Sequence, residues 1–404
     1  MEDSALLEQL KGQKWDRITA EEDKGLKLLL SDQNQSQKIP YMYNSELKIT
    51  LARQIQEEQV INGISALKKL GLLKNLQICV TLDQYADKPT FKDLLLKVSN
   101  QLGQLKVLNS LEIVNIQQYS LGQESILNDI CNIEQLQNLE IKEQGFAFNL
   151  SNLQFDSIYA NQFSMIFKCT LLKKLTIHLI RKIECSEEFK SELKKLENLH
   201  QLEEFNLFSS IKNESFYEYL GHHLSKLPNL KNFEIAFLNF EAPDVGQFSN
   251  NIMKLSQNIC KSTSIEQIRI NTFKIGEQEE QYNQAINYIS QIKQLKSFKI
   301  VAQNQHNIFD KLNQFTQLQS LSLILSQSVN PQQLQALKNL TQLKRLDFYS
   351  VQAMDYQKLR DLLASIKCLK NLTYISIQDY NWLLQKIKKL PNLVEFEIID
   401  EENL

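Results

Sequence analysis

Residues 337–348 read LKNLTQLKRLDF, and these twelve residues indicate the fold most directly. Its second half has the pattern Leu-x-x-Leu-x-Phe, formed by Leu343, Leu346 and Phe348. The last positions alternate apolar and polar residues, which is typical of a β-strand with one buried face. The stretch therefore predicts a turn followed by a short strand.

The same pattern, with Leu, Ile or Phe at the apolar sites, returns along most of the chain. Self-similarity of this kind is the signature of a repeat architecture and outweighs structure predictions made window by window. Successive copies are 21 residues apart at the closest (Ile375 to Phe396) and 36 at the widest (Leu139 to Leu175). The central apolar residues of the copies are Leu76, Leu111, Leu139, Leu175, Phe205, Phe233, Ile268, Phe298, Leu321, Leu346, Ile375 and Phe396.

The rest of each unit has helical spacing. Residues 355–367 place Leu359, Leu362 and Ile366 on one helix face, which predicts an amphipathic helix there. Asn330 precedes Pro331, a combination that predicts a helix start, because Asn caps helices and proline suits the first helical position. One unit is thus expected to contain a helix, a turn, a short strand and a returning loop.

Such a unit cannot bury its own apolar face, but stacked neighbours can. We therefore expect an α/β fold, a curved solenoid of about 12 irregular repeats. The strands would form a parallel sheet on the concave face and the helices would lie on the convex face, because helices pack more widely than strands.

These repeats resemble the leucine-rich repeat family, in particular its long-repeat, ribonuclease-inhibitor-like members. The resemblance runs from Leu73 to the last residues and rests on the ordered Leu, Ile and Phe positions. The family pattern usually continues with Asn or Cys three residues after the last apolar site, and this chain departs from it. That slot holds Gln144, Ile180 and Ser210, among others, so an irregular arc is expected instead of a smooth horseshoe.

The first residues lack the repeat, which suggests two regions: residues 1–45 as an N-terminal helical cap and residues 46–404 as the solenoid. Thr19 and Glu22 form a capping-box pattern ahead of a leucine-rich stretch. Leu47 and Ile49 read as a first, degenerate strand. The alternative for residues 1–45 is a docking module, such as one that recruits a ubiquitin ligase.

Composition narrows the class of protein. The chain has 404 residues, 45 basic and 47 acidic, and a net charge of −2, so no overall field draws it to nucleic acid or anionic lipid. Its six cysteines include no Cys-x-x-Cys pair, and the Met-Glu-Asp-Ser start is not that of a secretory signal. We therefore expect a reducing, cytoplasmic location. No apolar run is long enough to predict a membrane-spanning helix.

Motifs for catalysis and cofactor binding are missing from the sequence. It contains no phosphate-binding loop, no dinucleotide fingerprint and no His-Glu-x-x-His. His222 and His223 are adjacent but have no further ligands nearby in sequence, so a surface helix end is favoured over a metal site. We therefore predict no enzyme activity, no cofactor, no metal and no catalytic residue.

The concave face is where a partner would bind. Side chains alternate along a strand, so the polar residue between the last two apolar sites and the residue after them would point away from the core. Charged and aromatic side chains at these positions suit a protein partner better than a small molecule. The predicted partner-binding residues are Glu112, Glu140, Phe208, Glu234, Arg269, Lys299, Ile324 and Tyr349.

We expect a non-enzymatic interaction scaffold that binds one or more proteins as a single copy within a larger complex. A cytoskeletal or ciliary assembly is suggested only by analogy with other repeat proteins. Two alternatives stay open. One is a substrate adaptor of a ubiquitin ligase, acting through residues 1–45. The other is a regulator of a small GTPase, with Arg269 and Arg345 as candidate residues.

Overall fold

The computed structural model describes residues 18–19, 45–51, 73–80, 110–114, 137–142, 166–179, 187–209, 211, 213–237, 245–272, 279–302, 308–325, 331–350, 356–378 and 393–399. The chain divides into two compact units. Unit 1 comprises Met1–His178 and Ser191–Leu202, and unit 2 comprises Leu179–Lys190 and Glu203–Leu404.

The described residues of unit 1 form six short parallel strands that pair in chain order. Leu76, Leu111, Leu139 and Leu175 are direct register partners, as their repeat positions predict. The degenerate first strand is also confirmed, because Leu47 on β2 pairs with Leu76 on β3. The strands are β1 (Ile18–Thr19), β2 (Ser45–Leu51), β3 (Leu73–Val80), β4 (Ser110–Val114), β5 (Asn138–Lys142) and β6 (Lys174–Leu179).

The predicted N-terminal cap lies largely outside the described residues. Thr19, which the sequence predicts as a helix cap, belongs to the two-residue strand β1, where it pairs with Lys48. The helix expected to follow it falls within residues 20–44, which the structure does not describe. The cap therefore stays a prediction.

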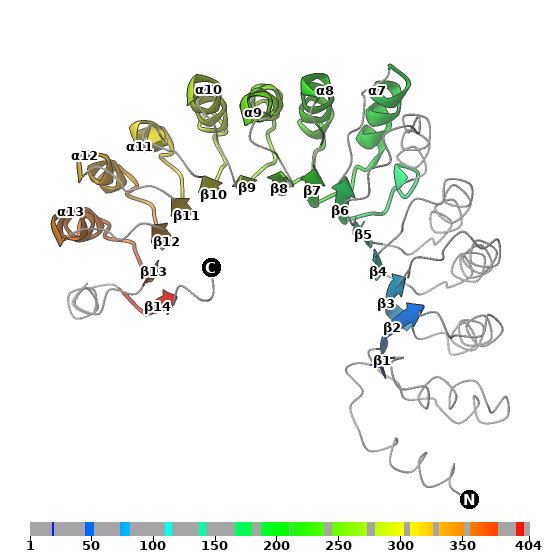
Figure 1. The fold of residues 1–404 in the computed structure, drawn as a ribbon, viewed down its shortest axis with the longest axis horizontal. Coiled ribbons are helices and arrows are strands. Elements are labelled where there is room, and N and C mark those ends of the chain that lie inside the picture. Colours follow the sequence, from blue (N-terminus) through cyan, green and yellow to red (C-terminus); the bar gives the residue numbers. More distant parts are fainter. Residues whose placement is uncertain are drawn as a thin grey trace, which may run out of the picture. The chain divides into compact units, whose positions relative to one another are not determined.

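Unit 2 contains an eight-stranded parallel sheet in which the strands follow one another in chain order, without closure into a barrel (Figure 1). The repeat positions are again direct register partners, from Phe205 on the first strand to Phe396 on the last. The strands are β7 (Glu204–Ser209), β8 (Asn232–Phe237), β9 (Gln267–Thr272), β10 (Ser297–Ala302), β11 (Ser320–Leu325), β12 (Arg345–Ser350), β13 (Tyr374–Gln378) and β14 (Glu395–Ile399).

Helices alternate with these strands and lie together on one face of the unit 2 sheet (Figure 1). The helix predicted over 355–367 is observed, and another begins at Pro331 as predicted. The described helices that precede or connect these strands are α7 (Glu187–Leu193), α8 (Glu214–Leu224), α9 (Val245–Ile259), α10 (Glu279–Ile289), α11 (Ile308–Lys311), α12 (Pro331–Leu334) and α13 (Tyr356–Ile366). In the described part of the chain, the 3-10 helices η4 (Leu312–Gln314) and η5 (Gln335–Asn339) continue α11 and α12, and η2 (Lys194–Asn198), which belongs to unit 1, follows α7.

A repeated backbone pattern aligns each strand of unit 2 with the next. The carbonyl that precedes one strand accepts hydrogen bonds from two successive amides at the start of the following strand. The Gln319 carbonyl, for example, accepts from Lys344 and Arg345 at 2.8 and 3.0 Å, and the Lys344 carbonyl accepts from Thr373 and Tyr374. Because the same bonds recur from β7 to β14, the register is kept at every step.

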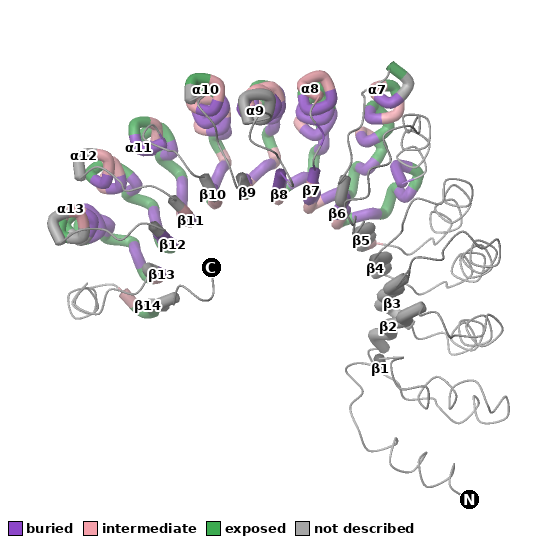
Figure 2. Tube along the Cα trace, in the orientation of Figure 1, coloured by how far each residue is buried: buried purple, intermediate pink, exposed green. Residues whose placement is uncertain are grey.

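The core of unit 2 lies between the sheet and its helices (Figure 2). Leu321 and Leu323 of β11 are fully buried there, as are Leu346 and Phe348 of β12. Aromatic rings extend the contact from strand to strand, as where Phe205 and Phe233 stack with ring centres 6.3 Å apart. Burial of these side chains, at about 25 cal/mol per Å² of apolar surface, is the main stabilising contribution.

Candidate interaction surface on the open face of the sheet

The sheet of unit 2 has a second face, on which none of the helices described in this unit lies (Figure 1). We call it the open face. Strand side chains alternate, so Leu321 and Leu323 point toward the helices and Ser320, Ser322 and Ile324 belong to the open face. Each strand thus contributes one residue to each row that runs across the sheet, and the parallel register places that residue beside the matching residue of the next strand.

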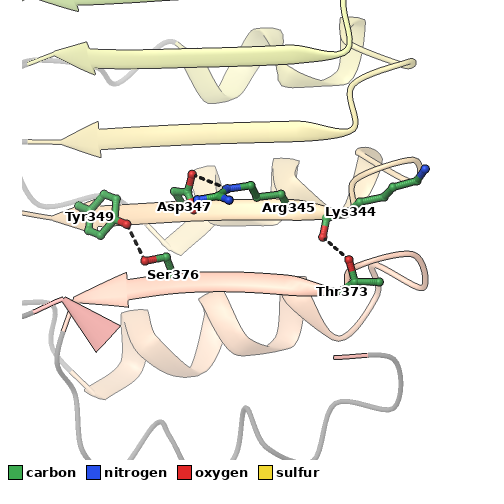
Figure 3. Close-up of polar contacts among 6 residues, drawn as sticks. All are labelled: Lys344, Arg345, Asp347, Tyr349, Thr373 and Ser376. Carbon is green, nitrogen blue, oxygen red and sulfur yellow. Dashed lines mark hydrogen bonds and ion pairs between the residues drawn. The ribbon is translucent and has the colours of Figure 1, made fainter. Parts of the chain in front are cut away.

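On β12 and β13 the open face carries an arginine held between an aromatic ring and a carboxylate, and Figure 3 shows its contact with the carboxylate. Arg345 donates from Nε to both Asp347 oxygens, at 3.2 and 3.1 Å. Its guanidinium carbon lies 4.0 Å from the centre of the Tyr374 ring, within the range of a cation–π contact. Partial burial opposes the charge, but the Asp347 contacts outweigh it and raise the pKa of Arg345 above its usual range.

The same two strands are joined by a buried hydroxyl pair. The hydroxyls of Tyr349 and Ser376 lie 2.6 Å apart (Figure 3). Tyr349 exposes 6% of its surface and Ser376 exposes none. Tyr349 was among the predicted contact residues, and its ring here packs into the sheet with little area left for a partner.

On β8 and β9 the open face carries an acid with two partners. Glu234 accepts a hydrogen bond of 2.8 Å from the Asn271 side chain, and its other oxygen lies 3.6 Å from the Arg269 guanidinium. The Arg269 side chain is 54% exposed, whereas that of Glu234 is 19% exposed. The carboxylate therefore lies deep in the surface and the guanidinium lies outermost.

Between these two regions, on β10 and β11, the side chains of the open face differ in charge and size from those on either side. Lys299 of β10 is half-buried and stands directly opposite Arg269 of β9. Its partner on the other side is Ser322, which is followed by Asp347. The middle of the open face therefore carries cations and small hydroxyl side chains in this row and the one before it, and Val301 and Ile324 are register partners in the row after it.

The structure brings together some of the predicted contact residues and separates others. Glu234, Arg269 and Lys299 follow one another on neighbouring strands, and Ile324 pairs with Tyr349. Phe208, on β7, is half-buried. Glu112 and Glu140 are direct neighbours on β4 and β5 of unit 1, and their side chains are outside the described set.

Tyr374 was not among the predicted contacts, and Arg345 was predicted only as a candidate residue for the GTPase alternative. They occupy the strand position two residues before the predicted polar column, where alternation alone would have placed them on the same face. The sequence signal was present, but it became informative only when the register set Arg345 opposite Tyr374. That pairing makes Arg345 a positioned cation.

No group of three or more His, Cys, Asp and Glu side chains suited to a metal occurs among the residues described above. His222 is exposed on α8, whereas His223 is 5% exposed and packs with its ring centre 6.3 Å from that of Tyr219. In the described part of the chain, no helix has the length and apolar character needed to cross a bilayer.

A scan against protein-family models and a search of curated proteins found no match to this chain. Its function is therefore inferred from the sheet and its side chains.

Proposed function

We propose that the chain is a leucine-rich repeat solenoid of about 12 irregular repeats and that it serves as a non-enzymatic scaffold for protein–protein interaction. Two observations support the repeat assignment. The predicted repeat positions are register partners within both units, and the same pair of backbone hydrogen bonds recurs at each step of unit 2. The irregular connections, from the four residues of α12 to the fifteen of α9, agree with the uneven repeat length.

The partner binds, on this proposal, to the open face of unit 2. The observation that carries it is the pair of arginines held on this face, because Arg269 and Arg345 are 54% and 50% exposed yet each lies beside a deeper carboxylate. Arginine and aromatic side chains are enriched at protein interfaces. These groups are spread over several strands and do not converge in one cavity, which favours a protein surface over a small molecule.

Fewer structural observations support the two alternative functions. The ubiquitin-ligase adaptor depends on residues 1–45, of which the structure describes only Ile18, Thr19 and Ser45. The GTPase regulator depends on an arginine that reaches into a partner, and Arg345 is tied to Asp347 by its Nε. Both stay predictions.

Site-specific photocrosslinking tests the scaffold proposal. A photoreactive residue is placed at Ile324 on the open face or, as the matched control, at Arg360, which is exposed on α13. Both proteins are produced in the cells from which the chain comes and are irradiated before lysis. We expect a defined set of partner proteins from position 324 and none of them from position 360. Crosslinks only from position 360, or from neither, would overturn binding through this face.

A further inference from the structure

Two cations of the open face stand side by side without an anion between them. Arg269 and Lys299 are direct register partners on the neighbouring strands β9 and β10, and like charges at opposed positions destabilise a sheet. Arg269 has one acidic neighbour, Glu234, at 3.6 Å. Lys299 forms neither an ion pair nor a side-chain hydrogen bond with any residue in the described ranges.

Three serines separate Lys299 from the next cation, Arg345. Ser297 and Ser320 lie in the row of Arg345, and Ser322 lies in the row of Lys299. None of the three hydroxyls is hydrogen-bonded to another side chain in the part of the chain that the structure describes. Their O–H groups are therefore free to donate. We call Arg269, Lys299, Ser297, Ser320, Ser322 and Arg345 the basic serine strip.

The acids near this strip are already engaged. Both oxygens of Asp347 face the Arg345 Nε, and both oxygens of Glu234 face donors from β9. The Asp347 side chain is 13% exposed against 50% for Arg345. Arg345 uses only its Nε in these contacts, so its terminal NH2 groups, the Lys299 ammonium and the hydroxyls of Ser297 and Ser320 present unused donors to solvent, whereas Ser322 is 7% exposed.

We propose that the basic serine strip binds a short acidic segment of the partner protein, with Asp or Glu carboxylates between Lys299 and Arg345. This inference rests on the proposed function and names the chemistry of its partner. Parallel strands are about 4.8 Å apart, so the strands of Lys299 and Arg345 are about 10 Å apart. Because Arg345 lies two residues before the row of Lys299, the two positions are about 12 Å apart. Residues i and i+4 of an extended segment point to the same side and span about 13 Å. Two carboxylates so spaced would contact both cations and relieve the repulsion between Arg269 and Lys299.

A long polyanion such as nucleic acid suits this surface less well. Glu234 on β8 and Glu395 on β14 flank the strip and would repel a phosphate backbone that continued past it. The Tyr374 ring, which could stack on a base, is already covered by the Arg345 guanidinium. The strip is therefore matched to a short run of negative charge.

The test uses the purified full-length chain and a fluorescein-labelled deca-glutamate peptide, with binding followed by fluorescence anisotropy. We expect Lys299→Gln to weaken binding about fivefold, since a contact to a charged group is worth about 1 kcal/mol at a solvated surface. The triple variant Arg269→Gln, Lys299→Gln, Arg345→Gln should bind at least about fiftyfold more weakly. Lys293→Gln is the matched control, because Lys293 is exposed in the turn before β10 and should not affect binding.

Three outcomes would overturn the inference. They are equal affinity of the wild type and the triple variant, equal loss in Lys293→Gln, and tighter binding of a DNA duplex that the triple change abolishes. A deca-glutamine peptide should not bind at all. The single Lys299→Gln variant keeps the test valid if the triple variant fails to fold, because removing one of two opposed cations should not lower the melting temperature.

Failure here is distinguishable from failure of the scaffold proposal. If photocrosslinking from position 324 persists in the triple variant, the open face still binds its partner and only the acidic chemistry is wrong. If the chain with the photoreactive residue at position 324 and no other change gives no photocrosslinks, but the wild type binds deca-glutamate, the strip exists and the scaffold proposal fails.

Discussion

The two faces of the unit 2 sheet carry very different side chains on the same strands. Toward the helices every described repeat position is apolar and buried, as with Phe298, Leu321 and Leu346, none of which is exposed. On the open face the neighbouring positions hold Lys299, Ser322 and Asp347. The repeat therefore requires apolar side chains on the helix-facing side, where they stabilise the fold. The side chains of the open face are free to differ from strand to strand, and it is there that a partner can be recognised.

The helix layer varies too, but only in length. The connection that contains α9 separates Phe233 from Ile268 by 35 residues, whereas that containing α12 separates Leu321 from Leu346 by 25. Both pairs of strands nevertheless keep the same register. Length differences are therefore absorbed in the helix layer, away from the open face.

The largest expected effect is the difference in stability between two variants of one strand, with the same charge placed on the helix-facing side or on the open face. Leu321→Asp would bury an unpaired carboxylate at a fully buried position and should cost at least about 4 kcal/mol, or unfold unit 2. Ser320→Asp, one residue away on the open face, should change stability by less than about 0.5 kcal/mol, because Arg345 stands opposite it. Urea unfolding measures both. Similar losses in the two variants would mean that the faces are not distinct.

A smaller effect is expected where two helices pack closely. A Cβ at Gly221 of α8 would lie 2.6 Å from the Leu255 carbonyl oxygen of α9. Gly221→Ala should therefore destabilise the protein by about 1–2 kcal/mol, although alanine favours a helix by about 1 kcal/mol. Glu218→Ala, at an exposed position on the same helix, is the control and should be neutral. A rise in melting temperature for Gly221→Ala would show that the helices separate easily.

Sequence reasoning predicted the helix-facing side of the molecule well. The apolar positions, such as Phe205 and Leu346, gave the strand register at every described pairing, because a period of two leaves only one face to bury. It predicted the open face less well. Tyr349 is a residue type typical of interfaces but is buried. The guanidinium of Arg345 is positioned by the ring of Tyr374, which is 29 residues away in the sequence. Such contacts arise across strands and leave no local pattern in the sequence.

One polar side chain in the helix layer should make stability depend on pH. The Tyr217 hydroxyl of α8 is hydrogen-bonded with the Ser209 hydroxyl and the Ile211 carbonyl, each at 3.0 Å. Burial raises the pKa of Tyr217 above its usual value of 10.0, and the Ser209 bond only partly opposes this. The folded protein thus keeps a proton that the unfolded chain loses above pH 10, so this contribution is complete below that pH and declines above it.

We therefore expect the stability difference between the wild type and Tyr217→Phe to shrink by about 1.4 kcal/mol between pH 9 and pH 11. Urea unfolding at several pH values measures it, and comparison with the phenylalanine variant cancels the effect of the other tyrosines. Parallel stability curves for the two proteins would mean that Tyr217 titrates at its ordinary pKa.

The smallest expected effect distinguishes residues of the open face that stabilise the sheet from residues that contact a partner. Tyr349→Phe removes the 2.6 Å contact with Ser376 and should cost about 1 kcal/mol, with a similar coupling energy in a double-mutant cycle with Ser376→Ala. Because Tyr349 is 6% exposed, photocrosslinking from position 324 should be unchanged. Loss of crosslinking at unchanged stability would instead make Tyr349 a contact residue. Its ring would then have to leave the sheet on binding, and the division between structural and recognition residues on this face would move one strand position.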